Sequence, residues 1–567
     1  MTLPPWKLLA DAKRQSTLDA IPREWKIKDA IPPAAELRDV TGYIEKFLSP
    51  REIEITSLDA YAIGEKTTTG EWTAVEVTEA FCHRAALAHQ LVNCLHEIFF
   101  DAAIEDARRL DSYFAEHKKP VGPLHGVPVS LKDQFHVKGV ETTMGYVGWI
   151  NTFQGLKNDP RQGTFESELV RELRALGAVL YCKTSVPVTL MCGETVNNII
   201  TYTTNPKNRL LACGGSSGGE GALVALKGSP GGFGTDIGGS VRIPAVFNGL
   251  FGIRPSSGRI PYEGAANSMD GQNMILSVIG PISSTARSLG FLFKAVLSQQ
   301  PWLYDPLVME LPWRNEIEEE TRRLVEQSRT NPGCLAFAIM KHDGIAMPHP
   351  PIARALNIVE TTLKKLGHKV IEWTPPSHKT AIELASAAYT LDGSADTHAA
   401  FSLSSETPPT QLLLPPTPSA QKTALEIASL NVQKRTYQKL YMDYWNSTAE
   451  VTGTGRPVDA VICPAAPHAA VIPTRYAHVG YTSVINLLDY SSVVLPVTSA
   501  DKSVDVLAER RERGFLSELD EVVHNGYDAD IYHGAPAGVQ MFGRRLQEEK
   551  MIVLAEYVGD AVKQESI

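Results

Sequence analysis

Two glycine- and serine-rich segments decide the fold of this chain, namely CGGSSGGEG at residues 213–221 and GTDIGGSVRIP at residues 234–244. Between positions 214 and 239, eleven of the 26 residues are glycines. Such a composition lets the backbone approach a ligand closely and adopt positive φ angles. We therefore expect a small polar pocket lined by the backbone amides of these two segments.

Two serines are predicted to meet in this pocket. The run EGALVALK at 220–227 favours a helix, so Ser216 and Ser217 are expected at a helix N-terminus, which carries a partial positive charge. Ser240 follows Asp236 and three intervening residues, and the consecutive amides of such a turn can stabilise the oxyanion of an acyl-transfer reaction. The simpler interpretation is a glycine turn capped by a serine, but it leaves the second serine pair unexplained.

The whole chain has the composition of an ordinary soluble globular protein of 567 residues, with 43% hydrophobic and 21% charged residues. A formal net charge of −10 argues against a nucleic-acid partner. The N-terminal residues do not form a signal peptide, and no apolar run is long enough to span a membrane. Seven cysteines without a CxxC pair indicate reduced thiols in a cytoplasmic protein. There is no HExxH or phosphate-binding GxxxxGK[ST] motif, so no metal or nucleotide site is predicted.

Helix and strand patterns alternate along the chain, which predicts an α/β fold. Residues 1–70 are interpreted as a helical flank with proline-rich joints, including a short helical pattern at 35–47, and residues 72–114 as helical after a capping-box-like start. An amphipathic helix at 166–176 leads directly into a strand at 178–182. The other predicted elements are strands within 121–133, at 335–340, 369–373, 458–463 and 493–497, helices at 316–327 and 352–366, and a proline-rich surface loop at 403–420.

Lys132 is the candidate base for a serine nucleophile. It follows the alternating strand pattern of residues 127–131, and a buried lysine without a carboxylate partner can be neutral near pH 7. Its neighbour Asp133 points to the opposite face of a strand. The alternative is an ordinary surface lysine at a strand end.

A different serine triad also has to be weighed. The residues GGSSG at 214–218 fit the nucleophile-elbow pattern G-x-S-x-G, and His533 lies late in the chain, where an α/β-hydrolase has its catalytic histidine. The elbow needs a strand immediately before it, whereas residues 208–213 form a poor one. This esterase hypothesis, with Ser216 and His533, also leaves residues 236–242 without a role.

Several long motifs resemble the amidase signature family, and within it the fungal acetamidase or general amidase group. They are GGSSGGEGALVAL, GTDIGGSVRIPAVFNGLFGIRPSSGRIP, PVGPLHGVPVSLKD, KTSVPVTLMCGETVNN, LDGSADT, VINLLDYSSVVLPVT and YHGAPAGVQMFGRRL. The resemblance extends from about residue 6 to 560. It implies one α/β/α domain over 71–560, with a central mixed sheet flanked by helices, a core at 120–300 and 455–560 and a variable region at 301–454.

The resemblance also implies a role for each motif residue. Ser240 is the implied nucleophile, Ser216 the bridging serine beside a cis peptide bond, and Lys132 the base. The implied oxyanion site consists of the amides of Ile237, Gly238, Gly239 and Ser240. Ser217, Asp236 and Arg242 are implied to support this network, and Leu190 and Met191 to line the acyl pocket.

The implied reaction is hydrolysis of a carboxamide to a carboxylate and ammonia without a cofactor, with a small amide such as acetamide as the default substrate. A larger amide, including one from secondary metabolism, is an alternative. An amidotransferase-type subunit and a binding protein with a relic site are the other hypotheses. The expected partner is a small molecule and not a nucleic acid or a membrane, and a homodimer is expected from the resemblance alone.

Overall fold

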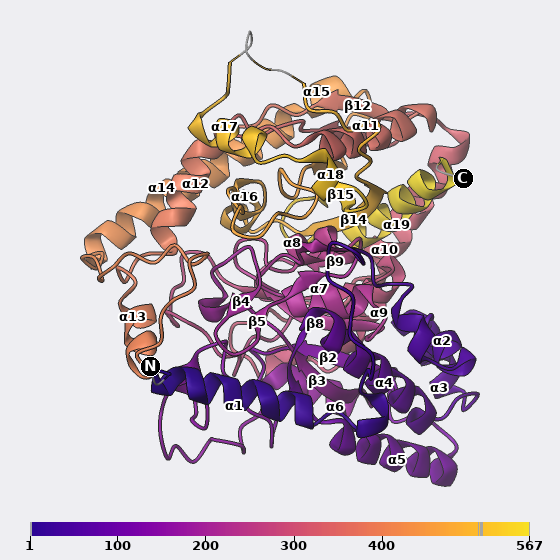
Figure 1. The fold of residues 1–567 in the computed structure, drawn as a ribbon. Coiled ribbons are helices and arrows are strands. Elements are labelled where there is room, and N and C mark those ends of the chain that lie inside the picture. The colour runs from indigo at the N-terminus through magenta and orange to yellow at the C-terminus, as the bar shows by residue number, and fades with distance from the viewer. Residues whose placement is uncertain (1–2, 509, 511–513, 566–567) are drawn as a thin grey trace.

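One mixed sheet of 11 strands forms the centre of the protein, in the order β1-β3-β2-β8-β10-β9-β14-β15-β13-β11-β12 (Figure 1). The computed structural model describes residues 3–508, 510 and 514–565. The strands of this sheet are β1 Leu95–Ile98, β2 Pro128–Lys132, β3 Val179–Thr184, β8 Gly231–Asp236, β9 Phe251–Arg254, β10 Val278–Ser283, β11 Ala336–Ile339, β12 Lys369–Glu372, β13 Ala460–Cys463, β14 Ser492–Ser499 and β15 Pro536–Phe542. Two small hairpin sheets pair β4 Val196–Asn197 with β5 Thr201–Tyr202, and β6 Thr204–Asn205 with β7 Asn208–Ala212.

Helices surround the sheet. They are α1 Pro5–Asp19, α2 Pro50–Thr56, α3 Ala60–Thr68, α4 Ala74–Val92, α5 Phe100–His117, α6 Glu168–Ala175, α7 Gly218–Ala225, α8 Arg242–Phe247, α9 Ala286–Leu297, α10 Asn315–Thr330, α11 Pro350–Lys365, α12 His378–Ala388, α13 Ala395–Ser402, α14 Ala424–Ser447, α15 Ala449–Thr452, α16 Gly480–Leu488, α17 Glu518–Asn525, α18 Ala529–Tyr532 and α19 Glu548–Glu565. In Figure 1, α1 lies along the lower edge, and α12 and α14 lie together at the left.

The core is divided between the two faces of the sheet, because successive strand residues point to opposite sides. Val179 and Tyr181 of β3 are buried in one apolar cluster together with residues of α4, α5 and α7. Leu180, between them, is buried in a second cluster that includes residues of α6, α9 and α19. The α/β class with a helix-flanked mixed sheet is thereby confirmed.

Three segments differ from the sequence prediction. The helical stretch predicted at 72–114 is two helices, α4 and α5, separated by the edge strand β1. Only residues Ile44–Phe47 of the pattern at 35–47 are helical, as a short 3₁₀ turn. The glycine-rich strand β8 was not predicted, since glycine weakens strands. Gly232 is required there, because a Cβ atom would collide with the Ser130 hydroxyl and the Glu220 carboxylate.

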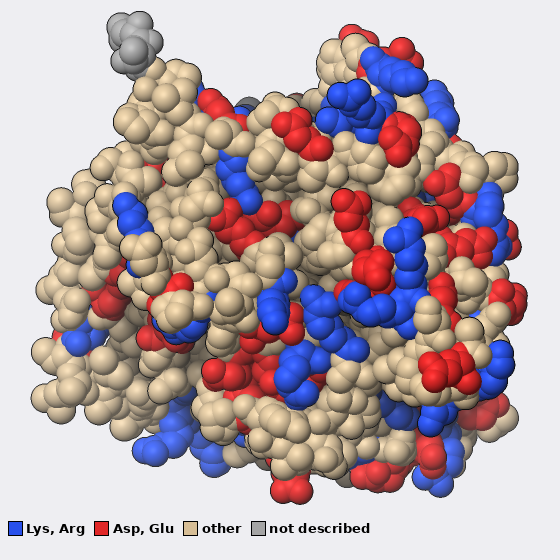
Figure 2. Space-filling model, turned by 90° about the horizontal axis from the view of Figure 1, so that it is seen from below, with Lys and Arg blue, Asp and Glu red and all other residues tan. Residues whose placement is uncertain are grey.

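On the face shown in Figure 2, several Lys and Arg side chains gather near the centre and are bordered by Asp and Glu side chains. Lys and Arg side chains are interspersed with Asp and Glu across this face. Among the described residues, no helix is both long and apolar enough to cross a bilayer.

Candidate active site

Neighbouring parallel strands bring the first site residues together. β2 pairs in parallel with β8, so their carboxyl ends lie at the same edge of the sheet, where β2 ends at Lys132 and β8 at Asp236. The segment that leads into α7 carries Ser216 past this edge. The Lys132 ammonium nitrogen, Nζ, lies 2.8 Å from the Ser216 hydroxyl, Oγ, and 2.7 Å from Thr235 Oγ1. The Gly215–Ser216 peptide bond is cis, as the resemblance implies.

Lys132 is fully buried, and burial lowers its pKa to about 7 even though the charges of Asp236 and Glu220 favour the protonated form. Asp133 does not pair with it. The side chain of Asp133 points to the other face of the strand, where Lys183 Nζ lies 3.2 Å from its Oδ1. Lys132 therefore has a substantial neutral population near pH 7, which is the form that can accept a proton.

The turn between β8 and α8 presents backbone amides next to Ser240. Within the described part of the chain, the amides of Ile237, Gly238 and Ser240 donate to no protein acceptor. The Gly239 amide donates to Asp236 Oδ1 at 2.8 Å, so it differs from the other three amides of the implied oxyanion site. Gly239 adopts a φ of 134°, a conformation in which a side chain would be strained.

Asp236 and Arg242 form a buried ion pair that fixes this turn. Arg242 Nη2 donates to Asp236 Oδ1 at 2.9 Å and Nε donates to Oδ2 at 3.0 Å. Burial opposes the charge of Asp236, but the Arg242 guanidinium and a hydrogen bond from Asn486 hold the pKa of its carboxyl below the ordinary value. Ser217 donates its amide to the Ser240 carbonyl at 3.1 Å. Ser217 thus connects the two glycine-rich segments, whereas the Asp236–Arg242 pair holds the second segment in shape.

Two side chains that the sequence analysis missed hold the carbonyls of the same turn. Tyr389, just after α12, donates its hydroxyl to the Ile237 carbonyl at 2.7 Å. Thr482, on α16, donates its hydroxyl to the Gly238 carbonyl at 2.6 Å. Neither residue lies in a glycine-rich motif. Because both residues lie far from residue 237 in the sequence, no local sequence pattern connects them with the turn.

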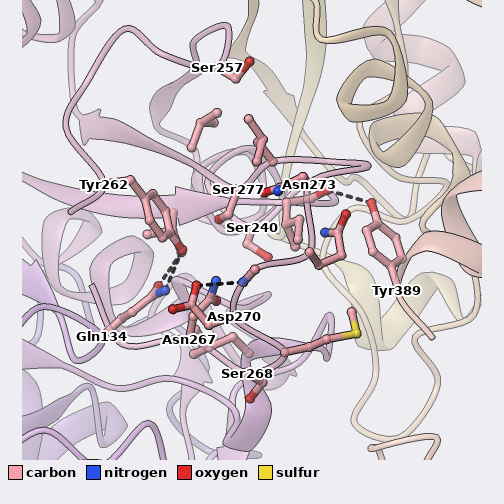
Figure 3. Close-up of a pocket in the computed structure, with 18 of the residues that line it drawn as sticks. Gln134, Ser240, Ser257, Tyr262, Asn267, Ser268, Asp270, Asn273, Ser277 and Tyr389 are labelled. Atoms are coloured by element: carbon pink, nitrogen blue, oxygen red, sulfur yellow. Dashed lines mark hydrogen bonds between the residues drawn. The ribbon is translucent and has the colours of Figure 1, made fainter. Parts of the chain in front are cut away.

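A cavity of about 220 Å³ opens beside the serines. Leu190, Met191, Ile237, Ser216 and Ser240 contribute to its wall, as do Tyr262 and Tyr389. Figure 3 shows the two tyrosines on opposite sides of Ser240. Three aspartates and no lysine, arginine or histidine are among the lining residues, which are drawn from the described part of the chain. The site therefore combines partly exposed Ser240 with a chamber whose wall contains both apolar side chains and three aspartates.

The structure does not bring His533 to the serines. Its side chain is 49% exposed, with Nδ1 lying 4.0 Å from Asp501 Oδ1 at the surface, and it does not line the cavity. The strand β7 before the GGSSG segment pairs with β6 in a two-stranded sheet that is separate from the main sheet. The geometry of a nucleophile elbow with His533 is absent.

Comparison with known proteins agrees with this site. The Amidase family matches residues 76–552. The chain is 47% identical to an acetamidase of Aspergillus oryzae and 46% identical to an acetamidase of Emericella nidulans, each over 98% of both proteins. The solved structure of a fatty acid amide hydrolase superposes with a TM-score of 0.89 at 34% identity, covering 98% of this chain and 95% of that one. The chain therefore belongs to the amidase signature family and is an amide hydrolase.

Proposed function

We propose that this enzyme hydrolyses a carboxamide to a carboxylate and ammonia, with Lys132 as base, Ser216 as proton relay and Ser240 as nucleophile. The main support is the 2.8 Å hydrogen bond between the buried Lys132 amine and Ser216. A serine hydroxyl is a weak nucleophile until a base takes its proton. A Ser–cis-Ser–Lys mechanism is also typical of the family.

In the proposed first step, neutral Lys132 accepts the proton of Ser216 while Ser216 accepts that of Ser240. The Ser240 oxygen then forms a bond to the amide carbon, and the carbonyl oxygen becomes negative. The unpaired amides of the 237–240 turn stabilise that charge. Ser216 next returns a proton to the amide nitrogen, the C–N bond breaks and ammonia leaves. Water attacks the resulting ester at Ser240 by the same relay, which releases the carboxylate and restores the free serine.

Small aliphatic amides are the first substrates to consider, because two relatives are named acetamidases. The cavity also favours a second candidate, a longer amide. Its volume of about 220 Å³ is several times the ~30 Å³ that one water molecule occupies in the liquid. Acetamide, a very small amide, leaves part of that space unfilled. We infer that the enzyme accepts acyl groups well beyond acetyl, with Leu190 and Met191 forming part of the acyl wall.

The acidic lining argues against a negatively charged substrate. Asp270, Asp305 and Asp392 line the cavity, and the described residues of its wall include no basic side chain to balance them. A cleft with one sign of charge repels ligands of the same sign. An amide whose acyl chain ends in a carboxylate is therefore expected to be a poor substrate.

Three single substitutions test the proposal, Lys132→Met, Ser216→Ala and Ser240→Ala, with ammonia release from acetamide, hexanamide and an aryl amide as readout. Each is expected to abolish turnover, and His533→Ala is the matched control that retains it. Wild-type hydrolysis that persisted in Ser240→Ala would contradict the proposal. Ammonia release by the purified chain alone also separates it from an amidotransferase subunit and from a binding protein.

A further inference from the structure

A chain of hydrogen bonds leads away from Lys132 on the side opposite to Ser216. Lys132 Nζ donates to Thr235 Oγ1, Thr235 Oγ1 donates to Gln134 Oε1, and Gln134 Nε2 donates to the Tyr262 hydroxyl, each at 2.7 Å. Lys132, Gln134 and Thr235 are buried. Figure 3 shows Gln134 and Tyr262 facing each other at the cavity wall. The proposed mechanism assigns no step to Thr235, Gln134 or Tyr262.

The direction of these bonds follows from the orientation of the Gln134 amide, whose nitrogen lies toward Tyr262 and whose oxygen lies toward Thr235. An amide side chain has one end that only accepts and one that only donates. Because Gln134 Nε2 is directed at Tyr262, its oxygen faces Thr235. The Thr235 hydroxyl has a single hydrogen, which goes to that oxygen, so toward Lys132 it can only accept.

This direction matters for the neutral amine, which has two N–H bonds and one lone pair. In the structure Lys132 Nζ has two hydrogen-bond partners among the described residues, Ser216 and Thr235. A Thr235 hydroxyl free to rotate could donate its hydrogen to the amine and occupy the lone pair. Because the Thr235 hydrogen is donated to Gln134, the Thr235 oxygen accepts an N–H of Lys132. The lone pair of the amine then faces its other partner, Ser216.

We propose that Thr235, Gln134 and Tyr262 are positioning residues that reserve the lone pair of neutral Lys132 for the Ser216 proton. The inference rests on the proposed function, since it assumes that Lys132 is the base. It adds that the base is oriented from the cavity wall, through a tyrosine that lines the cavity. We name these three residues the orienting relay.

The charges around Lys132 determine how the relay can be tested. Asp236 at the end of β8 and Glu220 on α7 are the charged groups acting on it, and Arg242 neutralises the former. Asp133 and Lys183 pair with each other on the opposite face of the sheet. Burial raises the pKa of Tyr262 to about 12, so its hydroxyl stays neutral throughout the working range. Burial raises the pKa of Glu220 to about 7, so the acid limb of the pH profile reports Lys132 together with Glu220, and the limb is compared in a Glu220→Gln background to isolate the lysine.

The decisive variant is Gln134→Met, which keeps the side-chain volume and removes the amide. The Thr235 hydroxyl is then free to donate to Lys132, which stabilises the neutral amine and blocks its lone pair. The plateau kcat is expected to fall about tenfold, the effect of one hydrogen bond, while the pKa of the acid limb shifts downward. General damage to packing would admit water and shift that limb upward, toward the ordinary lysine value of 10.5.

A second substitution distinguishes orientation from structure. In the double variant Gln134→Met/Thr235→Val no hydroxyl remains to block the lone pair, so kcat is expected to recover several-fold relative to Gln134→Met. Tyr262→Phe leaves the Gln134 amide free to rotate. We therefore expect it to lower kcat and the pKa of the acid limb in the same direction as Gln134→Met, but by less. Tyr181→Phe is the matched control, because it removes a buried tyrosine hydroxyl that donates to the Gly228 carbonyl at 2.6 Å, away from the relay.

The outcomes separate the relay from the proposed function. If Lys132→Met abolishes hydrolysis but Gln134→Met and Tyr262→Phe leave the acid limb in place, or if the double variant is slower than Gln134→Met, the relay is wrong and the triad stands. If hydrolysis survives Lys132→Met, the proposed function itself is wrong. Should Gln134→Met fail to fold, Tyr262→Phe carries the same test, since it removes a single oxygen.

Discussion

Replacing Tyr389 by Phe tests whether the 237–240 turn is held in shape for catalysis. The Tyr389 hydroxyl donates to the Ile237 carbonyl at 2.7 Å. A planar trans peptide unit points its C=O and N–H in opposite directions. Holding the Ile237 carbonyl therefore also fixes the direction of the Gly238 amide. This amide is one of those proposed to stabilise the oxyanion.

The size of the effect follows from the loss of this one hydrogen bond. Its net value is about 0.5–1.5 kcal/mol, and if the turn is needed in shape only in the transition state, kcat falls roughly 2- to 10-fold. KM is expected to change little, because the ground-state amide does not yet carry the negative charge. Thr482→Val, which removes the bond to the Gly238 carbonyl, is expected to act in the same direction.

The assay is steady-state ammonia release from a soluble aliphatic amide, with kcat and KM determined separately. Tyr437→Phe is the control, since its hydroxyl donates to the Pro376 carbonyl at 3.3 Å, outside the site. A rise in KM at unchanged kcat would refute the reasoning. Tyr389 would then be only a part of the cavity wall that contacts substrate.

Three further predictions concern charge. Because the base must be neutral, kcat/KM is expected to rise with pH through about 7, the value to which burial lowers the pKa of Lys132. Glu220→Gln should lower the midpoint of this rise, because it removes a charge that favours the protonated lysine. Lys183→Met leaves the buried Asp133 carboxylate unpaired and should destabilise the fold by about 3–5 kcal/mol, measured by denaturant unfolding; an unchanged midpoint would mean that the pair is dispensable. Among amides of similar length, succinamate should have a much lower kcat/KM than pentanamide or 4-aminobutanamide, and added salt should reduce this difference in kcat/KM. Equal kcat/KM values would show that the acidic lining does not affect substrate binding.

The sequence carried enough to predict the α/β class and most elements with strong periodicity. The helix predicted at 166–176 is α6, Glu168–Ala175, and the strand at 178–182 is β3. The strand β8 could not be predicted, because glycines replace the β-branched residues that usually indicate a strand. Gly232 is instead required by the Ser130 and Glu220 side chains packed against it, and Gly234 by the Ser217 side chain. Such a requirement exists only in the folded protein.

The candidate site, like the fold, could be predicted only in part from the sequence. Ser216, Ser240 and Lys132 lie in long motifs, and the structure places Lys132 in contact with Ser216. Their catalytic roles stay predictions, as do the domain boundaries at 70 and 560, the cytoplasmic location and the homodimer. Tyr389 and Thr482 come from helices far along the chain. A single sequence contains no pattern that pairs them with residue 237.

Covalent labelling of Ser240 tests the central claim most directly. A fluorophosphonate reacts with a serine whose hydroxyl is activated, and intact mass followed by peptide mapping locates the adduct. We predict one adduct per chain, on the peptide that contains Ser240, with a labelling rate that rises through pH 7 and is lost in Lys132→Met. An adduct on Ser216, or labelling that persists in Ser240→Ala, would contradict the account.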